Sequence, residues 1–165
     1  MTSLTFRILC ALFAVTAAFT AFGQAETDVL SNQQLANARA LVRESQEAFV
    51  RDELRLTAAE DAAFWPLYEE YRADMLPIQD RYVALVAGYM RQYQTGVLTD
   101  DYAEQMLDDY FDIKGDLLRM RKKYIRPFRK TLPMLKVARF YQLENKLNAE
   151  VDAELALVVP LFEAN

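Results

Sequence analysis

The stretch that decides the fold is LTAAEDAAFWPLYEEYRADMLPIQDRYVALVAGYMRQY, residues 56–93. Its apolar side chains recur every seven residues in two interleaved series. The series are Phe64, Tyr71, Ile78 and Leu85, and Tyr68, Met75, Tyr82 and Tyr89. This spacing is typical of a long helix that packs one apolar side against partner helices. We call these residues the seam.

Residue types at both ends of the stretch predict where the helix begins and ends. Thr57 followed by Glu60 predicts a capping box, and Gly96 is a typical helix stop. Pro66 and Pro77 lie inside the stretch, where each removes a backbone hydrogen-bond donor. Because the apolar period continues through both prolines, we expect one long kinked helix rather than two helices.

The rest of the chain predicts three further helices. Residues 32–54 carry a narrow apolar stripe, which indicates a covering helix. Residues 100–130 repeat the seam spacing after a short connection, so an antiparallel pair with residues 56–93 is expected. Residues 133–158 predict the last helix. No stretch alternates as a strand does, so the predicted fold is all-α, a long kinked helical hairpin in a four-helix bundle-like arrangement.

The N-terminus has the features of a secretory signal peptide over residues 1–25. A basic residue precedes an apolar run over residues 8–22. Small residues favour cleavage after Ala25, with cleavage after Gly23 as the alternative. Residues 26–165 are then expected to form a single all-helical domain in the periplasm, with no integral membrane span after cleavage. An uncleaved anchor is disfavoured because the run falls short of the ~20 residues that cross a bilayer.

The composition excludes several kinds of chemistry. The chain has no histidine, and its one cysteine, Cys10, lies in the predicted signal peptide. The mature chain therefore lacks the commonest general base, a thiol nucleophile and the usual zinc ligands. The net charge of −5 argues against nucleic acid as a partner. We predict no enzyme activity and no cofactor, with a weak carboxylate-only calcium or magnesium site along residues 100–116 as an alternative.

A strip of cations on the third predicted helix is the first candidate binding surface. It lies on the side of the helix away from the apolar positions. This basic strip comprises Arg119, Lys122, Lys123, Arg126, Arg129 and Lys130. The strip can attract an acidic partner or lipid headgroups. The alternative is a solvated surface that complements the helix dipole.

Part of the seam is the second candidate surface. Tyrosine hydroxyls require water or a polar partner, and methionine adapts its shape to different ligands. The residues are Tyr68, Tyr71, Met75, Tyr82 and Tyr89. We expect some of them to reach the surface and to hold unfolded polypeptide, with core packing as the alternative.

Two predicted helices begin with the same two residues. These are Leu56 and Thr57 in LTAAE, and Leu98 and Thr99 in LTDDY. They resemble the L-T-x-x-Q motif of the Spy/CpxP-like family of small periplasmic helical proteins, although Glu60 and Tyr102 replace the glutamines. The resemblance implies a bent four-helix protein, often a cradle-shaped homodimer. The family that it resembles includes an ATP-independent chaperone, an inhibitor of an envelope-stress sensor and zinc-binding relatives. We expect the two threonines to act as helix caps.

The leading hypothesis is therefore a periplasmic, ATP-independent chaperone-like or envelope-stress protein. Its partners would be unfolded or envelope proteins, with a homodimer as a further expectation. The alternative is a regulatory binding protein that docks on one envelope partner, such as a sensor domain.

Overall fold

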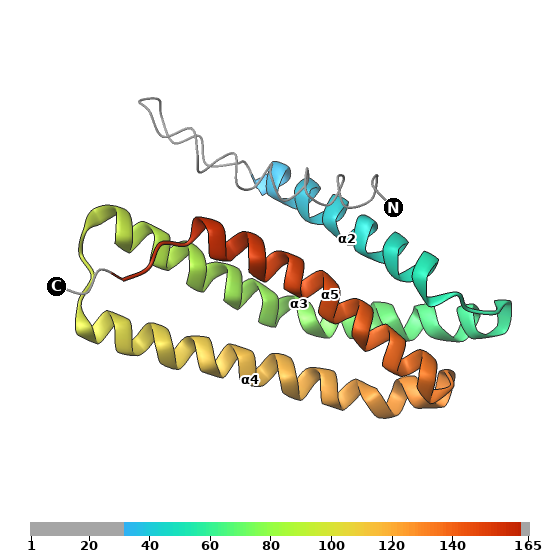
Figure 1. Ribbon diagram of the computed structural model, residues 1–165. Helices are drawn as coiled ribbons and strands as arrows, with labels where there is room; N and C mark the ends of the chain where they lie inside the picture. The colour runs from blue at the N-terminus through green and yellow to red at the C-terminus, as the bar shows by residue number, and fades with distance from the viewer. Residues whose placement is uncertain (1–31, 163–165) are drawn as a thin grey trace.

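The computed structural model describes residues 32–162, and over this part the chain forms helices without strands. The helices are α2 (Asn32–Leu54), α3 (Ala58–Thr95), α4 (Asp100–Thr131) and α5 (Met134–Val158) (Figure 1). The predicted all-α, bundle-like fold is confirmed. The predicted signal peptide, its two alternative cleavage positions and Cys10 lie outside the described residues.

The ends of α3 form as their residue types predict. The Glu60 backbone N–H donates to the Thr57 side chain, and the Thr57 backbone N–H donates to the Glu60 carboxylate at 2.8 Å, which completes the capping box. Gly96 ends the helix in the left-handed region, at φ 68°, where a side chain would be strained. The helix continues through Pro66 and Pro77. Figure 1 shows that it bends near its middle rather than dividing.

The long helices α3 and α4 lie side by side and antiparallel, as the short connection between them predicts. Helix α5 folds back along this pair, and α2 packs against α5. The α2–α3 and α4–α5 turns therefore lie at one end of an elongated molecule, and the α3–α4 turn lies at the other (Figure 1). At the first end the Lys136 ammonium donates to the Arg55 carbonyl at 3.2 Å, which joins the two turns.

An aromatic core fills the half of the molecule that contains these two turns. All four helices contribute to it, and the Phe128 and Phe140 rings lie 4.8 Å apart between centroids. Its buried members are Val50, Leu54, Phe64, Tyr68, Tyr71, Met75, Tyr124, Phe128, Leu132, Val137, Phe140, Leu143 and Leu147. Near the α3–α4 turn the helices are packed less completely, because Tyr89 and Ile113 are the buried apolar residues outside this cluster among those described.

Candidate functional site

The seam tyrosines and methionine form core rather than an exposed surface. Tyr68, Tyr71, Met75 and Tyr89 are buried, and Tyr82 is half-buried. The expected client surface on these side chains is therefore wrong for the chain as folded. The reason is that α4 and α5 cover the seam from two sides. A heptad pattern predicts an apolar side of a helix but does not predict how many partner helices cover it.

Several of the buried tyrosine hydroxyls find partners inside the protein. Tyr71 donates to the Glu144 carboxylate at 3.0 Å. Tyr89 donates to the Pro160 carbonyl at 2.8 Å. Tyr124 donates to the Asp74 carboxylate at 2.7 Å. Of the seam tyrosines, Tyr71 and Tyr89 therefore bond their hydroxyls inside the protein without exposing their rings, whereas the buried Tyr68 hydroxyl has no hydrogen-bond partner among the described residues.

Glu144 is a buried carboxylate that sequence reasoning missed. It is 5% exposed and lies on the apolar side of α5, between Leu143 and Leu147 in the chain. Burial raises the pKa of Glu144, against the opposing effect of the Arg72 guanidinium. Burial, followed by the nearby Glu144 carboxylate, also raises the pKa of Tyr71. The one signal in the sequence is a carboxylate within a regular apolar stripe.

The two L-T motifs act as helix caps, as expected. At the first motif the Glu60 carboxylate also forms an ion pair with Lys136 of α5. The Lys136 hydrogen bond, and then the bond from the Thr57 backbone, lower the pKa of Glu60 to about 2. At the second motif the Tyr102 backbone N–H donates to the Thr99 hydroxyl at 3.2 Å. The Tyr102 side chain has no carboxylate that could accept a hydrogen bond from the Thr99 backbone N–H. The second motif is therefore a simple N-cap and not a capping box.

The leucines of these motifs have a packing role. Leu56 packs partly buried against the aromatic core. Leu98 is half-buried in the α3–α4 turn. Both motifs start a helix, because the Thr57 and Thr99 side chains accept hydrogen bonds from backbone N–H groups of the first turn.

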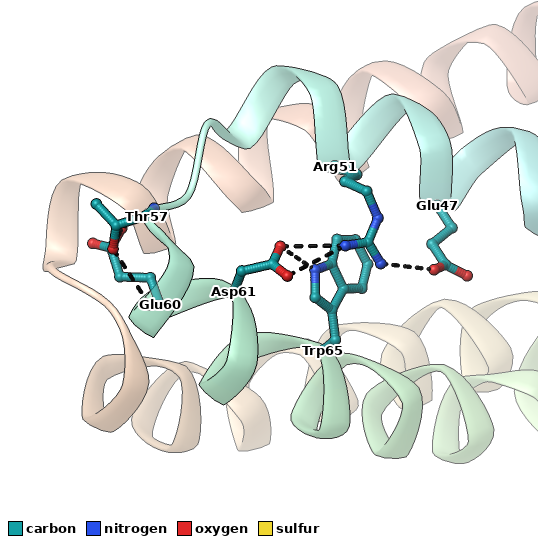
Figure 2. Close-up of polar contacts among 6 residues, drawn as sticks. All are labelled: Glu47, Arg51, Thr57, Glu60, Asp61 and Trp65. Atoms are coloured by element: carbon teal, nitrogen blue, oxygen red, sulfur yellow. Dashed lines mark hydrogen bonds and ion pairs between the residues drawn. The ribbon is translucent and has the colours of Figure 1, made fainter.

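A polar clasp holds α2 to α3 next to the first motif (Figure 2). The Arg51 guanidinium lies 3.8 Å from the centre of the Trp65 ring. It pairs with Asp61 at 3.3 Å and with Glu47 at 3.2 Å. The Trp65 indole N–H donates to Asp61 at 2.6 Å. The contacts of Arg51 with Trp65 and Asp61 run from α2 to α3, so the clasp joins the two helices.

The structure divides the basic strip into paired and unpaired cations. Arg119 pairs with Asp116 of the same helix, and Lys123 pairs with Asp74 of α3 at 2.8 Å. Hydrogen bonds from Lys123 and Tyr124 lower the pKa of Asp74. The remaining four cations are exposed and form no ion pair with any residue the structure describes. They are Lys122, Arg126, Arg129 and Lys130.

An exposed apolar surface lies on α4 beside these cations, and sequence reasoning missed it. Leu107, Phe111 and Leu118 point away from the bundle, and Phe111 is 66% exposed. Their spacing of four and seven residues places them on one side of the helix, and Lys122 follows four residues after Leu118. We call these three apolar residues the outer face of α4. The spacing could have revealed it, but the seam on the same helix is the stronger pattern.

Within residues 32–162 no three carboxylates gather to hold a metal ion, so the aspartates of 100–116 do not form such a cluster. The hollows on the surface are shallow and open. One of them is lined by Ile125, Arg126, Arg129 and Lys130. No helix in the described part of the chain is long and apolar enough to cross a membrane.

Comparison with known proteins found no matching family model, no matching curated protein and no matching solved structure. The resemblance to the Spy/CpxP-like family therefore depends on the two short L-T motifs and the helical architecture.

Proposed function

We propose that this protein binds unfolded or partly folded polypeptides in the periplasm without ATP, as a holdase-like chaperone. The observation that carries the proposal is the outer face of α4. There Leu107, Phe111 and Leu118 are at least half exposed, next to the unpaired cations Lys122 and Arg126. An exposed apolar surface bordered by charge is typical of an interaction site.

The chemistry of this surface suits an unfolded chain. An unfolded polypeptide presents apolar side chains at irregular spacing, together with carboxylates. Three apolar side chains and two cations along one helix side can contact both kinds of group without a shaped pocket. The flexible lysine and arginine stems add apolar contact area of their own.

A suppression-of-aggregation assay tests the proposal on the mature chain with a chemically denatured client. We expect a several-fold molar excess to reduce light scattering, and Phe111→Ser with Leu118→Ser to abolish most of the protection. Leu157→Ser is the matched control, because Leu157 is 80% exposed on α5 and lies outside the outer face of α4. No protection by the unmodified protein would reject the proposal.

The unpaired cations favour a second candidate, a regulatory protein that docks on one acidic envelope partner such as a sensor domain. Charge reversal of Lys122 and Arg126 separates the two candidates. We expect it to abolish saturable binding to a single acidic domain, whereas client protection should fall only partly because Phe111 and Leu118 remain. Arg119 is unsuitable for this test, because it already pairs with Asp116.

Export and self-association belong to the same proposal. N-terminal sequencing of the protein recovered from the cell envelope tests export, with Glu26 expected as the first residue and Gln24 as the alternative. A cytoplasmic protein that retains Met1 would contradict it.

Light scattering tests the proposed homodimer, for which the mass in solution should be twice that of the mature chain.

A further inference from the structure

The cations of this acidic protein are concentrated in one segment. Residues 117–143 contain nine lysines and arginines and no aspartate or glutamate, although the whole chain has a net charge of −5. The segment comprises the second half of α4, the turn and the first half of α5. Because α5 folds back on α4, the segment lies in the half of the elongated molecule that contains the α4–α5 turn (Figure 1).

Part of this charge is neutralised by residues from other helices. Lys123 pairs with Asp74, and Lys136 pairs with Glu60. Arg139 pairs with Glu53 at 3.0 Å. The cations left without an ion pair among residues 32–162 include three within one helical turn of one another, Arg126, Arg129 and Lys130. These three border the shallow hollow above Ile125.

Two large apolar side chains are exposed shortly after these cations in the chain. Met134 is 53% exposed and Leu135 is 86% exposed, at the start of α5 and directly after the turn. The next positions of α5 that turn inward are Val137 and Phe140, so neither side chain contributes to the buried core. We call Arg126, Arg129, Lys130, Met134 and Leu135 the basic tip.

The composition and shape of the basic tip fit a flat anionic surface better than a folded protein. A stable interface with a folded partner typically buries about 800 Å² on each side. The end of a helical rod is narrow for that requirement (Figure 1). A membrane accepts a narrow end, because headgroup phosphates bind the cations while apolar side chains enter the interface.

We propose that the basic tip docks this protein on the surface of a membrane rich in anionic lipids. Arg126, Arg129 and Lys130 contact headgroup phosphates, and Met134 and Leu135 enter the boundary of the acyl chains. The binding is peripheral and uses other apolar residues than the chaperone function proposed above, although Arg126 borders both surfaces. Leu107 and Phe111 of the outer face of α4 stay uncovered, because both lie more than four helical turns before Arg126 on α4, whereas Leu118 lies about two turns before it.

Co-sedimentation of the mature chain with vesicles tests the proposal. We expect binding to vesicles of phosphatidylglycerol and phosphatidylcholine at least tenfold tighter than to pure phosphatidylcholine, and weaker binding as salt is added. The triple variant Arg126→Glu, Arg129→Glu and Lys130→Glu should lose at least tenfold in affinity. Met134→Ser with Leu135→Ser should lose about three- to tenfold, because apolar insertion adds to the electrostatic term.

Matched controls keep the test specific. Arg91→Glu changes an exposed cation near the other end of α3, and Leu157→Ser changes an equally exposed apolar residue on α5. Both variants should bind vesicles as the unmodified chain does. Phe111→Ser with Leu118→Ser should also bind normally, so failure of the chaperone proposal would leave this result unaffected. Circular dichroism should show native helix content in every variant.

Three outcomes would overturn the proposal. One is equal binding to anionic and neutral vesicles, and another is full binding by the triple charge-reversal variant. The third is absence of vesicle binding together with tight binding of polyglutamate that the triple variant loses. That third result would assign the basic tip to an acidic polypeptide instead.

Discussion

Glu144 is buried in the core near the Arg72 and Arg121 guanidinium groups, with the Tyr71 hydroxyl as its hydrogen-bond donor. One helical turn away on α3, the buried Tyr68 hydroxyl has no hydrogen-bond partner among the described residues. The two tyrosines therefore make opposite contributions to stability through the same functional group. Removal of a hydroxyl that satisfies a buried carboxylate is costly, whereas removal of an unpaired one is not.

This difference gives a prediction for two matched variants. Tyr71→Phe leaves Glu144 without its donor and should lower the free energy of unfolding by about 1–3 kcal/mol. Tyr68→Phe removes an unsatisfied hydroxyl and should leave that free energy unchanged or raise it by up to about 1 kcal/mol. Urea denaturation followed by circular dichroism measures both. An equal loss in the two variants would contradict the assigned hydrogen bonding.

The raised pKa of Glu144 predicts a pH-dependent effect of Glu144→Gln. The folded protein holds the carboxyl proton more tightly than the unfolded chain does. The stability that depends on the neutral carboxyl is therefore present below the unfolded-state pKa of 4.5 and is lost as the pH rises through the folded-state pKa.

Glutamine keeps an acceptor for Tyr71 and carries no charge at any pH. The melting temperature of Glu144→Gln relative to the unmodified protein should therefore increase between pH 4 and pH 8. Thermal melts across this range measure the difference. A difference that stays constant with pH would show that burial does not raise the pKa of Glu144.

The ends of the individual helices and their apolar sides can be predicted from short stretches of sequence. The predicted stretch 56–93 differs by two residues at each end from α3, Ala58–Thr95. The threonine caps, the glycine stop and the seven-residue apolar period each involve neighbours within about one or two helical turns, so the sequence alone determines them.

The candidate site could not be predicted in the same way, because it depends on contacts between helices. Burial of Tyr71 depends on α4 and α5, which lie far from it in the chain. The pairing of Lys123 depends on Asp74, 49 residues earlier. The basic strip predicted from α4 alone therefore includes cations that form ion pairs in the folded chain, such as Lys123, and cations that form none. Contacts with other helices decide which is which.

At the joint between α2 and α3, the clasp around Trp65 yields a prediction for Arg51→Ala. The variant loses the cation–π contact and two ion pairs that are about half exposed, so the free energy of unfolding should fall by only about 1 kcal/mol. Trp65 is the one tryptophan of the chain, so tryptophan fluorescence reports on the surroundings of this ring, at the joint and against the core.

We expect the emission of folded Arg51→Ala to shift to longer wavelength as water reaches the indole. Arg43→Ala is the control, because Arg43 is exposed on the same helix and has no ion pair within the described part of the chain. Unchanged emission in Arg51→Ala would mean that the stacked guanidinium does not shield the ring.

Over the whole molecule, packing is uneven. Residues 40–48 of α2 are exposed or half-buried, whereas Phe64, Tyr68 and Tyr71 of α3 are buried. Local opening is easiest where few side chains are buried, so hydrogen exchange should be fast over residues 40–48 of α2 and slow around Phe64. Mass spectrometry of exchanged peptides measures the difference. Similar protection in both regions would indicate a partner that covers α2, such as a second copy of the chain.

Charge is separated along α4, with seven carboxylates between Asp100 and Asp116 and the basic strip after them. The folded chain therefore has an electric dipole along its long axis. Near a charged surface such a rod experiences a torque before any side chain makes contact. At physiological ionic strength the field of the surface falls off over about 8 Å, so the rotation takes place during the last step of approach. A negatively charged surface turns the α4–α5 end forward, and a positively charged one turns the α3–α4 end forward.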